Sequence, residues 1–201
     1  MNMDTQAAAQ LTAEQIAEDR TTLTGFWLYL MTDLVLFASL FAVFAVMRAE
    51  NISMLGPKLP TDAPYVLIET ALLLTSSFAA GFALLAARAK REIALVLSLV
   101  VSLLLGAAFL YMELSEFAKL ALAGNSWRAS GYLSSYFTLV GTHGLHILVG
   151  LLWGVSLVIA LSLKGLTRSN LRKLALWALF WHFLDIVWIF IFTVVYLQNL
   201  T

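Results

Sequence analysis

Five long apolar stretches divide this chain and limit what it can fold into. They cover residues 25–47, 66–87, 93–111, 131–163 and 174–197. Roughly 20 apolar residues are needed to cross the hydrocarbon core of a bilayer as a helix. Only helices and closed barrels satisfy their backbone in lipid, and continuous rather than alternating apolar runs favour helices. The sequence therefore predicts an all-α integral membrane bundle of five transmembrane helices.

Composition supports this class and excludes others. Of the 201 residues, 61% are hydrophobic and only 12% are charged, more apolar surface than a soluble domain of this size can bury. The formal net charge of zero argues against a nucleic-acid partner. The absence of cysteine excludes thiolate metal sites and disulfides. The first two dozen residues are charged and lack an apolar core, so we expect no cleavable signal peptide.

The segments between the spans are typical of loops and tight turns. All three prolines lie in 51–64, which predicts a loop. Short charged segments at 88–92 and 164–173 predict two antiparallel helical hairpins. We expect residues 1–24 to form a cytoplasmic tail, disordered or folded as a short amphipathic helix, and residues 25–201 to form one five-helix domain.

The cationic residues predict the orientation of the chain, because cytoplasmic loops are enriched in Lys and Arg. One side of the predicted topology carries eight of the twelve: Arg20, Arg88, Lys90, Arg91, Lys164, Arg168, Arg172 and Lys173. The other side carries Arg48, Lys58, Lys119 and Arg128. We therefore expect a cytoplasmic amino terminus and a periplasmic carboxyl terminus.

Ionisable residues inside the spans are the candidate functional positions. They are Asp33, Glu69, His143, His146, His182 and Asp185. A charged side chain at the bilayer centre costs about 2.5–3.5 kcal/mol on insertion scales, so each should be paired, neutral or turned toward protein. His143 and His146 are three residues apart, as are His182 and Asp185, so each pair shares one helix face.

Three interpretations of these faces stay open. We favour a structural joint in which His182 and Asp185 fix the fourth and fifth spans to each other. A path for protons or a ligand is the second, because intramembrane ionisable groups are functional by default. A metal site is the third and is disfavoured: His143 and His146 on one helix cannot take opposite axial positions of one haem, and three histidines are too few for an oxygen-reducing centre.

Small residues indicate where helices approach closely, and some aromatic residues indicate span ends. Gly150 and Gly154 form a G-x-x-x-G pattern in the fourth span, and Ala79, Ala83 and Ala87 recur every four residues in the second. Tyr196 lies near the end of the fifth span, where aromatic side chains commonly meet the membrane interface.

Several of these segments resemble a known family when they are taken together. The carrying segments are GTHGLHILVG (141–150), FWHFLDIVWIFIFTVVYL (180–197), GFWLYLMTDLVLFASLFA (25–42), VLIETALLLTSS (66–77), LSEF (114–117) and SGYLSSYF (130–137). They resemble subunit III of the haem–copper respiratory oxidases, in the family's order, over everything except the amino-terminal tail. The family's polar signature falls on the six ionisable residues named above.

The resemblance implies a non-catalytic subunit of a proton-pumping terminal oxidase in the bacterial inner membrane. Five spans are most similar to the cytochrome o (bo-type) ubiquinol oxidase form, and a bacterial cytochrome c oxidase subunit III is the alternative. The family leads us to expect docking on subunit I, with subunit II and a small subunit IV in the complex and no nucleic acid. Haem and copper are expected in subunit I and none on this chain, which is expected to contact membrane lipids including structural phospholipid.

Overall fold

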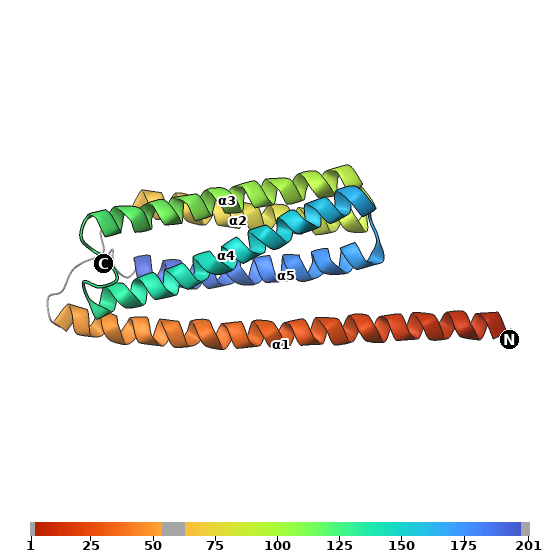
Figure 1. Cartoon of the computed structure of the whole chain (residues 1–201), viewed down its shortest axis with the longest axis horizontal. Helices are drawn as coiled ribbons and strands as arrows, with labels where there is room; N and C mark the ends of the chain where they lie inside the picture. Colours follow the sequence, from red (N-terminus) through yellow and green to blue (C-terminus); the bar gives the residue numbers. More distant parts are fainter. Residues whose placement is uncertain (1–2, 54–62, 198–201) are drawn as a thin grey trace. The chain divides into compact units, whose positions relative to one another are not determined.

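Five α-helices form the part of the chain that the structure, a computed structural model, describes (Figure 1). It describes the backbone of residues 3–53 and 63–197 and the side chains of 17–52 and 64–197. The elements are α1 (Met3–Ser53), α2 (Ala63–Arg88), α3 (Glu92–Leu122), α4 (Gly131–Lys164), α5 (Arg168–Ile191) and a π-helical turn η1 (Phe192–Tyr196). All five α-helices are long and apolar enough to cross a membrane. The predicted all-α, five-span class is confirmed.

The chain divides into two compact units, residues 1–35 and residues 36–201. The first unit is the leading part of α1. The second contains the end of α1 and the helices α2 to α5. The predicted boundary between a tail and a bundle at residue 24 stays a prediction, as does most of the predicted loop 51–64, because residues 54–62 lie outside the described part of the chain.

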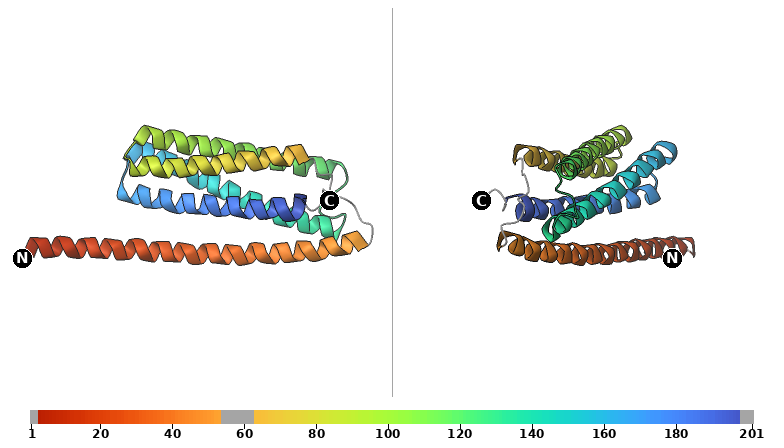
Figure 2. Two further views of the ribbon diagram at one scale, coloured as in Figure 1. Left: turned by 180° about the vertical axis from the view of Figure 1, so that it is seen from behind. Right: turned by 60° about the vertical axis from the view of Figure 1, so that its left-hand side comes forward.

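The helices α2 to α5 form a four-helix bundle in the second unit. Each packs against two neighbours, in the order α2, α3, α4, α5 and back to α2. The two helices of the first hairpin, α2 and α3, lie side by side along their length (Figure 2). Both predicted hairpins are therefore present, and their turns lie at the same end of the bundle.

Local capping explains where the helices of the second hairpin begin and end. Gly165 takes a positive φ of 64° after α4, and its N–H donates to the carbonyl oxygen of Leu161 over 2.9 Å. The hydroxyl of Thr167 accepts a hydrogen bond from the Asn170 N–H, which starts α5 at Arg168. The cap lies inside the segment predicted as a turn, so α5 begins earlier than its apolar pattern indicates.

Tryptophans of α5 fill the bundle core against glycines of neighbouring helices. Trp181 is 1% exposed, and a Cβ built at Gly106 of α3 would lie 2.5 Å from its Cζ2 atom. A Cβ at Gly150 of α4 would lie 2.7 Å from its Cζ3 atom. At Gly154 a Cβ would collide with Leu103. The predicted close approach at Gly150 and Gly154 is confirmed.

The alanine pattern of α2 is confirmed in part. Ala83 and Ala87 are buried, as expected, whereas Ala79 is only half-buried. The buried position one residue further along is Ala80. The face of α2 toward the bundle is therefore shifted by one residue at its centre.

We predict that Gly106→Ala destabilises the protein although alanine is the better helix former. Alanine gains about 1 kcal/mol over glycine within a helix, but an added methyl group in a filled core typically costs about 1–3 kcal/mol. Gly81→Ala is the matched control, since the nearest atoms to its Cβ belong to His182 at 3.9 Å. Thermal unfolding of the purified protein in detergent should give a lower midpoint for Gly106→Ala and an unchanged or higher one for Gly81→Ala. Equal midpoints would contradict the packing argument.

Candidate functional site

Three intramembrane side chains keep all of their polar atoms without a hydrogen-bond partner in the described part of the chain. They are Glu69 on α2, Glu113 on α3 and His143 on α4. Glu69 and His143 are 0% exposed and Glu113 is 1% exposed. Buried polar groups are normally paired, so each exception calls for an explanation beyond packing. Glu69 and His143 were predicted candidates, whereas Glu113 was not among them.

The carboxyl group of Glu113 lies against the backbone of α4 at Gly144. A Cβ at Gly144 would lie 2.8 Å from Oε1 and 3.1 Å from Oε2 of Glu113. Glycine therefore leaves room here for the carboxyl group, which would have to shift if a Cβ were added. Glu69 and Glu116 both act on Glu113 electrostatically. We call Glu69, Glu113 and Glu116 the acid cluster.

Two tyrosines connect the acid cluster to α4 and to the end of the chain. The hydroxyl of Tyr196 donates a hydrogen bond to Oε2 of Glu116 over 3.1 Å. The hydroxyl of Tyr136 lies 2.9 Å from that of Tyr196, and it donates because the single Tyr196 proton is engaged by Glu116. Tyr196 lies in η1 and is 2% exposed. Tyr196 lies near a span end as predicted, but its side chain makes contacts inside the bundle and does not face lipid.

Aromatic rings enclose the imidazole of His143. It stacks on Trp188 with ring centroids 5.3 Å apart and an interplanar angle of 28°. Phe109 of α3 meets its edge at 6.0 Å. The indole N–H of Trp188 is occupied elsewhere, donating to the hydroxyl of Thr70 over 3.1 Å. The aromatic side chains therefore pack around His143 without satisfying its nitrogen atoms.

His182 connects α5 to α2, which corrects the predicted joint with α4. Its Nδ1 atom lies 2.6 Å from the Ser77 hydroxyl oxygen. The carboxylate of Asp185 interacts with the same hydroxyl group and with His182. The adjacent Trp181 supports this joint, since its indole N–H donates to the Ser76 hydroxyl oxygen over 3.0 Å.

The rotation of α5 explains the correction. Trp177, on the face toward α4, donates its indole N–H to the carbonyl oxygen of Gly150 over 2.9 Å. Phe180 of α5 also faces α4, where its ring centroid lies 6.4 Å from that of His146. With these residues turned to α4, the face that carries His182 and Asp185 is turned to α2.

The two remaining predicted residues lie on α4 and α1. His146 is half-buried, and its Nδ1–H donates to the carbonyl oxygen of Thr142 over 2.7 Å. Its ring centroid lies 5.3 Å from that of Phe37. Asp33 belongs to the first unit, where its carboxyl group interacts with the hydroxyl of Tyr29 one helical turn earlier. The structure therefore distributes the six predicted residues over several separate environments.

Metal-binding geometry is absent among side chains 17–52 and 64–197. No three His, Asp or Glu residues in that part of the chain lie close enough together to hold a metal ion. Serine side chains, which sequence reasoning did not single out, provide many of the polar joints instead. Ser76 of α2 and Ser102 of α3 each donate to the other's carbonyl oxygen, over 2.7 and 2.9 Å. The only sequence signal for them is their place on the apolar face of a span.

Comparison with known proteins identifies the family of this bundle. The family model described as cytochrome c oxidase subunit III matches residues 5–199. The chain belongs to this family. Subunit 3 of the cytochrome bo(3) ubiquinol oxidase of Pseudomonas aeruginosa is 50% identical over 178 residues, covering 89% of this chain and 85% of the relative. The Pseudomonas putida subunit of the same description is 44% identical over 178 residues, with coverage of 88% and 85%.

A relative with a different described donor is also similar. Cytochrome c oxidase subunit 3 of Bacillus sp. (strain PS3) is 39% identical over 185 residues, covering 91% of this chain and 88% of the relative. The predicted membership in the subunit III family is confirmed. Together with the five apolar helices, it makes this chain a multi-pass membrane protein and an accessory subunit of an oxidoreductase complex.

We predict that Ser77→Ala lowers stability by about 1–3 kcal/mol, because it leaves the buried side of His182 without its partner. Ser156→Ala is the control, because Ser156 is exposed and bonds only to Trp153 of its own helix. Thermal midpoints of the two purified variants in the same detergent provide the comparison. A loss for Ser77→Ala no larger than that for Ser156→Ala would contradict a joint between α2 and α5.

Proposed function

We propose that this chain is the non-catalytic subunit III of a proton-pumping ubiquinol oxidase of a bacterial inner membrane. The observation that carries the proposal is 50% identity over 178 residues to a protein described as subunit 3 of such an oxidase. Identity falls to 39% for the relative described as a cytochrome c oxidase subunit. The relatives at 50% and 44% identity are both described as ubiquinol oxidase subunits, which favours quinol as the electron donor of the complex, with cytochrome c as the alternative.

The proposed role is to stabilise the complex and support its proton uptake. Subunit I would hold the haem and copper and would contact this chain directly, with subunit II and a small subunit IV completing the assembly. A family member of this kind needs no redox centre of its own. The exposed apolar faces of the spans, for example Phe78 at 71% and Leu104 at 65%, provide surface for such subunits and for lipid.

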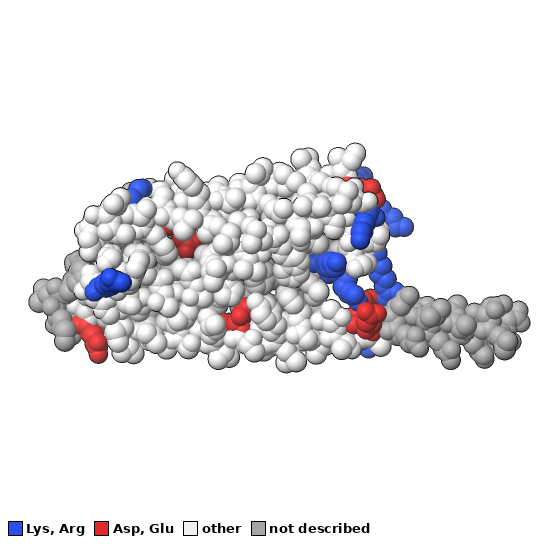
Figure 3. All heavy atoms as spheres, in the orientation of Figure 1, with Lys and Arg blue, Asp and Glu red and all other residues white. Residues whose placement is uncertain are grey.

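The charge distribution of the bundle supports the proposed orientation. Cationic side chains gather at the end that carries the α2–α3 and α4–α5 turns (Figure 3). There the bundle carries Arg88, Lys90, Arg91, Lys164, Arg168, Arg172 and Lys173. The described cations at the opposite end are Arg48, Lys119 and Arg128. By the positive-inside rule, the turn end faces the cytoplasm and the carboxyl terminus the periplasm.

The polar residues of the spans take two roles in this proposal. His182, Asp185 and Ser77 hold α5 to α2. Glu69 and His143 are buried without a hydrogen-bond partner in the described part of the chain, an arrangement that packing alone does not favour and that is compatible with proton handling. Asp33 and His146 complete the set of intramembrane polar residues that the family resemblance marks.

We predict that an oxidase assembled without this chain retains its haem and its initial quinol oxidation rate but loses activity faster during turnover. The physical reason is that the haem and copper that reduce oxygen would lie in subunit I, whereas this bundle would stabilise subunit I. Absorbance spectra and oxygen-electrode traces of the complex with and without the chain provide the measurement, with ubiquinol and reduced cytochrome c as alternative donors. Loss of stoichiometric haem together with this chain would contradict a non-catalytic role. Activity with cytochrome c alone would select the alternative donor.

We predict that Asp185→Asn weakens retention of this chain in the purified complex more than it slows initial turnover. The substitution removes a charge from the half-buried group formed with Ser77 and His182, at a cost of about 1–3 kcal/mol. Subunit stoichiometry after purification reports assembly, and proton release per electron reports pumping. Intact assembly combined with an immediate loss of pumping would instead assign Asp185 to proton conduction.

A further inference from the structure

A pocket opens between the two helical turns at the basic end of the bundle. It has a volume of about 570 Å³ and lies between the α2–α3 turn on one side and the α4–α5 turn with the start of α5 on the other. Leu84, Leu166 and Leu171 form apolar parts of its wall. Arg88, Lys90 and Glu92 supply its charged groups. We call it the turn pocket.

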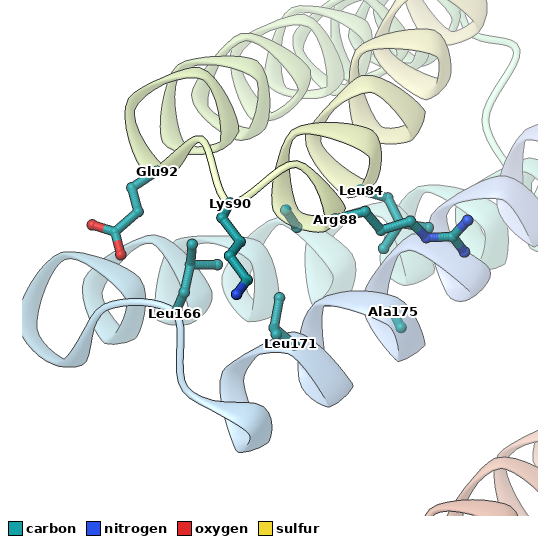
Figure 4. A pocket seen from close by; sticks show the side chains of 8 residues that line it. Leu84, Arg88, Lys90, Glu92, Leu166, Leu171 and Ala175 are labelled. Carbon is teal, nitrogen blue, oxygen red and sulfur yellow. The ribbon is translucent and has the colours of Figure 1, made fainter.

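The cations of the turn pocket are available to a ligand. The Lys90 side chain extends from the α2–α3 turn into the space beside Leu166 and Leu171 (Figure 4). Arg88 extends along the pocket toward Ala175 (Figure 4). Both side chains are exposed, and no ion pair involves either of them in the described part of the chain. Glu92 lies on the other side, where its Oε1 atom is 3.6 Å from the Cβ position of Gly165.

The backbone at Lys90 indicates that a side chain is kept there at a cost. Lys90 has a φ of 55°, the left-handed conformation that glycine adopts most readily. Its N–H donates to the carbonyl oxygen of Ala87 over 3.1 Å, and the N–H of Arg91 donates to that of Ala86 over 3.0 Å. These two bonds are the Schellman motif, whose left-handed position is usually glycine. Because lysine is less favourable than glycine in this conformation, its presence indicates that the ammonium group has a function.

The surroundings of the turn pocket select an amphipathic ligand. Apolar side chains are exposed next to the charged turn, with Leu85 at 59% and Ile93 at 86%. Because α2 and α3 cross the membrane and end at this turn, the pocket lies where the hydrocarbon meets the headgroups. A ligand there can place its phosphate beside the cations that line the pocket and its glycerol and acyl parts against leucines. Basic pockets between helices on the cytoplasmic side bind such headgroups.

We propose that the turn pocket binds the headgroup of an anionic phospholipid from the cytoplasmic leaflet. Arg88 and Lys90 contact the phosphodiester, and the guanidinium of Arg88 can bind two of its oxygens at once. Leu84, Leu166 and Leu171 contact the apolar part of the lipid. The excess of cations on this end disfavours a zwitterionic lipid relative to an anionic one. The inference rests on the five membrane-spanning helices and on the orientation proposed above, and it does not depend on the electron donor.

The test measures binding of phosphatidylglycerol to the purified full-length protein in its complex. The complex is placed in phosphatidylcholine nanodiscs with increasing fractions of photoactivatable phosphatidylglycerol, and labelling of this chain is quantified. We expect the double variant Arg88→Gln/Lys90→Gln to reduce apparent affinity about tenfold. The matched control Lys164→Gln/Lys173→Gln removes the same charge from exposed positions at the same end that do not line the pocket. It should change affinity by less than about threefold.

A second variant separates binding from folding. Lys90→Gly removes the ammonium group and also relieves the left-handed backbone, so thermal stability should be unchanged or higher while phosphatidylglycerol labelling falls. Equal losses in the pocket variant and the matched control would overturn the proposal in favour of a diffuse basic surface. Unchanged labelling in Lys90→Gly and in the double variant would overturn it as well. Suppression of labelling by millimolar inorganic phosphate would overturn it by showing an anion site that needs no lipid.

Discussion

Three indole N–H groups on α5 fix the bundle, because a membrane interior offers no water to replace a missing partner. Trp177 donates to a backbone oxygen of α4, whereas Trp181 and Trp188 donate to hydroxyl groups of α2. Each bond sets both the rotation and the height of α5 relative to a neighbour. The glycines opposite Trp181 then become necessary, since a large ring held in one position leaves no room for a side chain. Packing and hydrogen bonding thus specify the same arrangement.

In a bundle whose three α5 tryptophans are hydrogen-bonded in this way, side chains without a hydrogen-bond partner need a separate explanation. Glu69, Glu113 and His143 lie in the same bundle as the satisfied tryptophans, and Gly144 is kept free of a side chain where the carboxyl group of Glu113 lies. Burying a polar group without a hydrogen bond costs roughly 2–7 kcal/mol, depending on the reference state. A sequence under pressure for stability alone would replace these residues by apolar ones. They are therefore the residues for which we propose a role in the working complex beyond packing.

The sequence predicted the features that depend on local physics, and it missed those that depend on helix rotation. Apolar length gave the five spans, and short charged segments gave both hairpin turns. Spacing correctly placed His182 and Asp185 on one face, but spacing does not say which neighbour that face meets. The answer, α2 rather than α4, follows from Trp177 and Phe180 occupying the α4 side. Tyr196 was missed as an internal donor because it lies in η1, where the helical period changes.

The two ends of the bundle place their charges differently: the cations of one end lie outside, whereas acids of the other lie inside. At the turn end the cations lie on the outside, and these exposed residues are the ones on which the positive-inside rule depends. At the other end Glu69 and Glu113 are turned inward and contribute little to the outer surface. A count of Lys and Arg residues in the loops is therefore enough to predict an orientation. The acids contact other parts of the protein instead. Their neighbours, such as Gly144 and Tyr196, are distant in sequence and are known only from the folded structure.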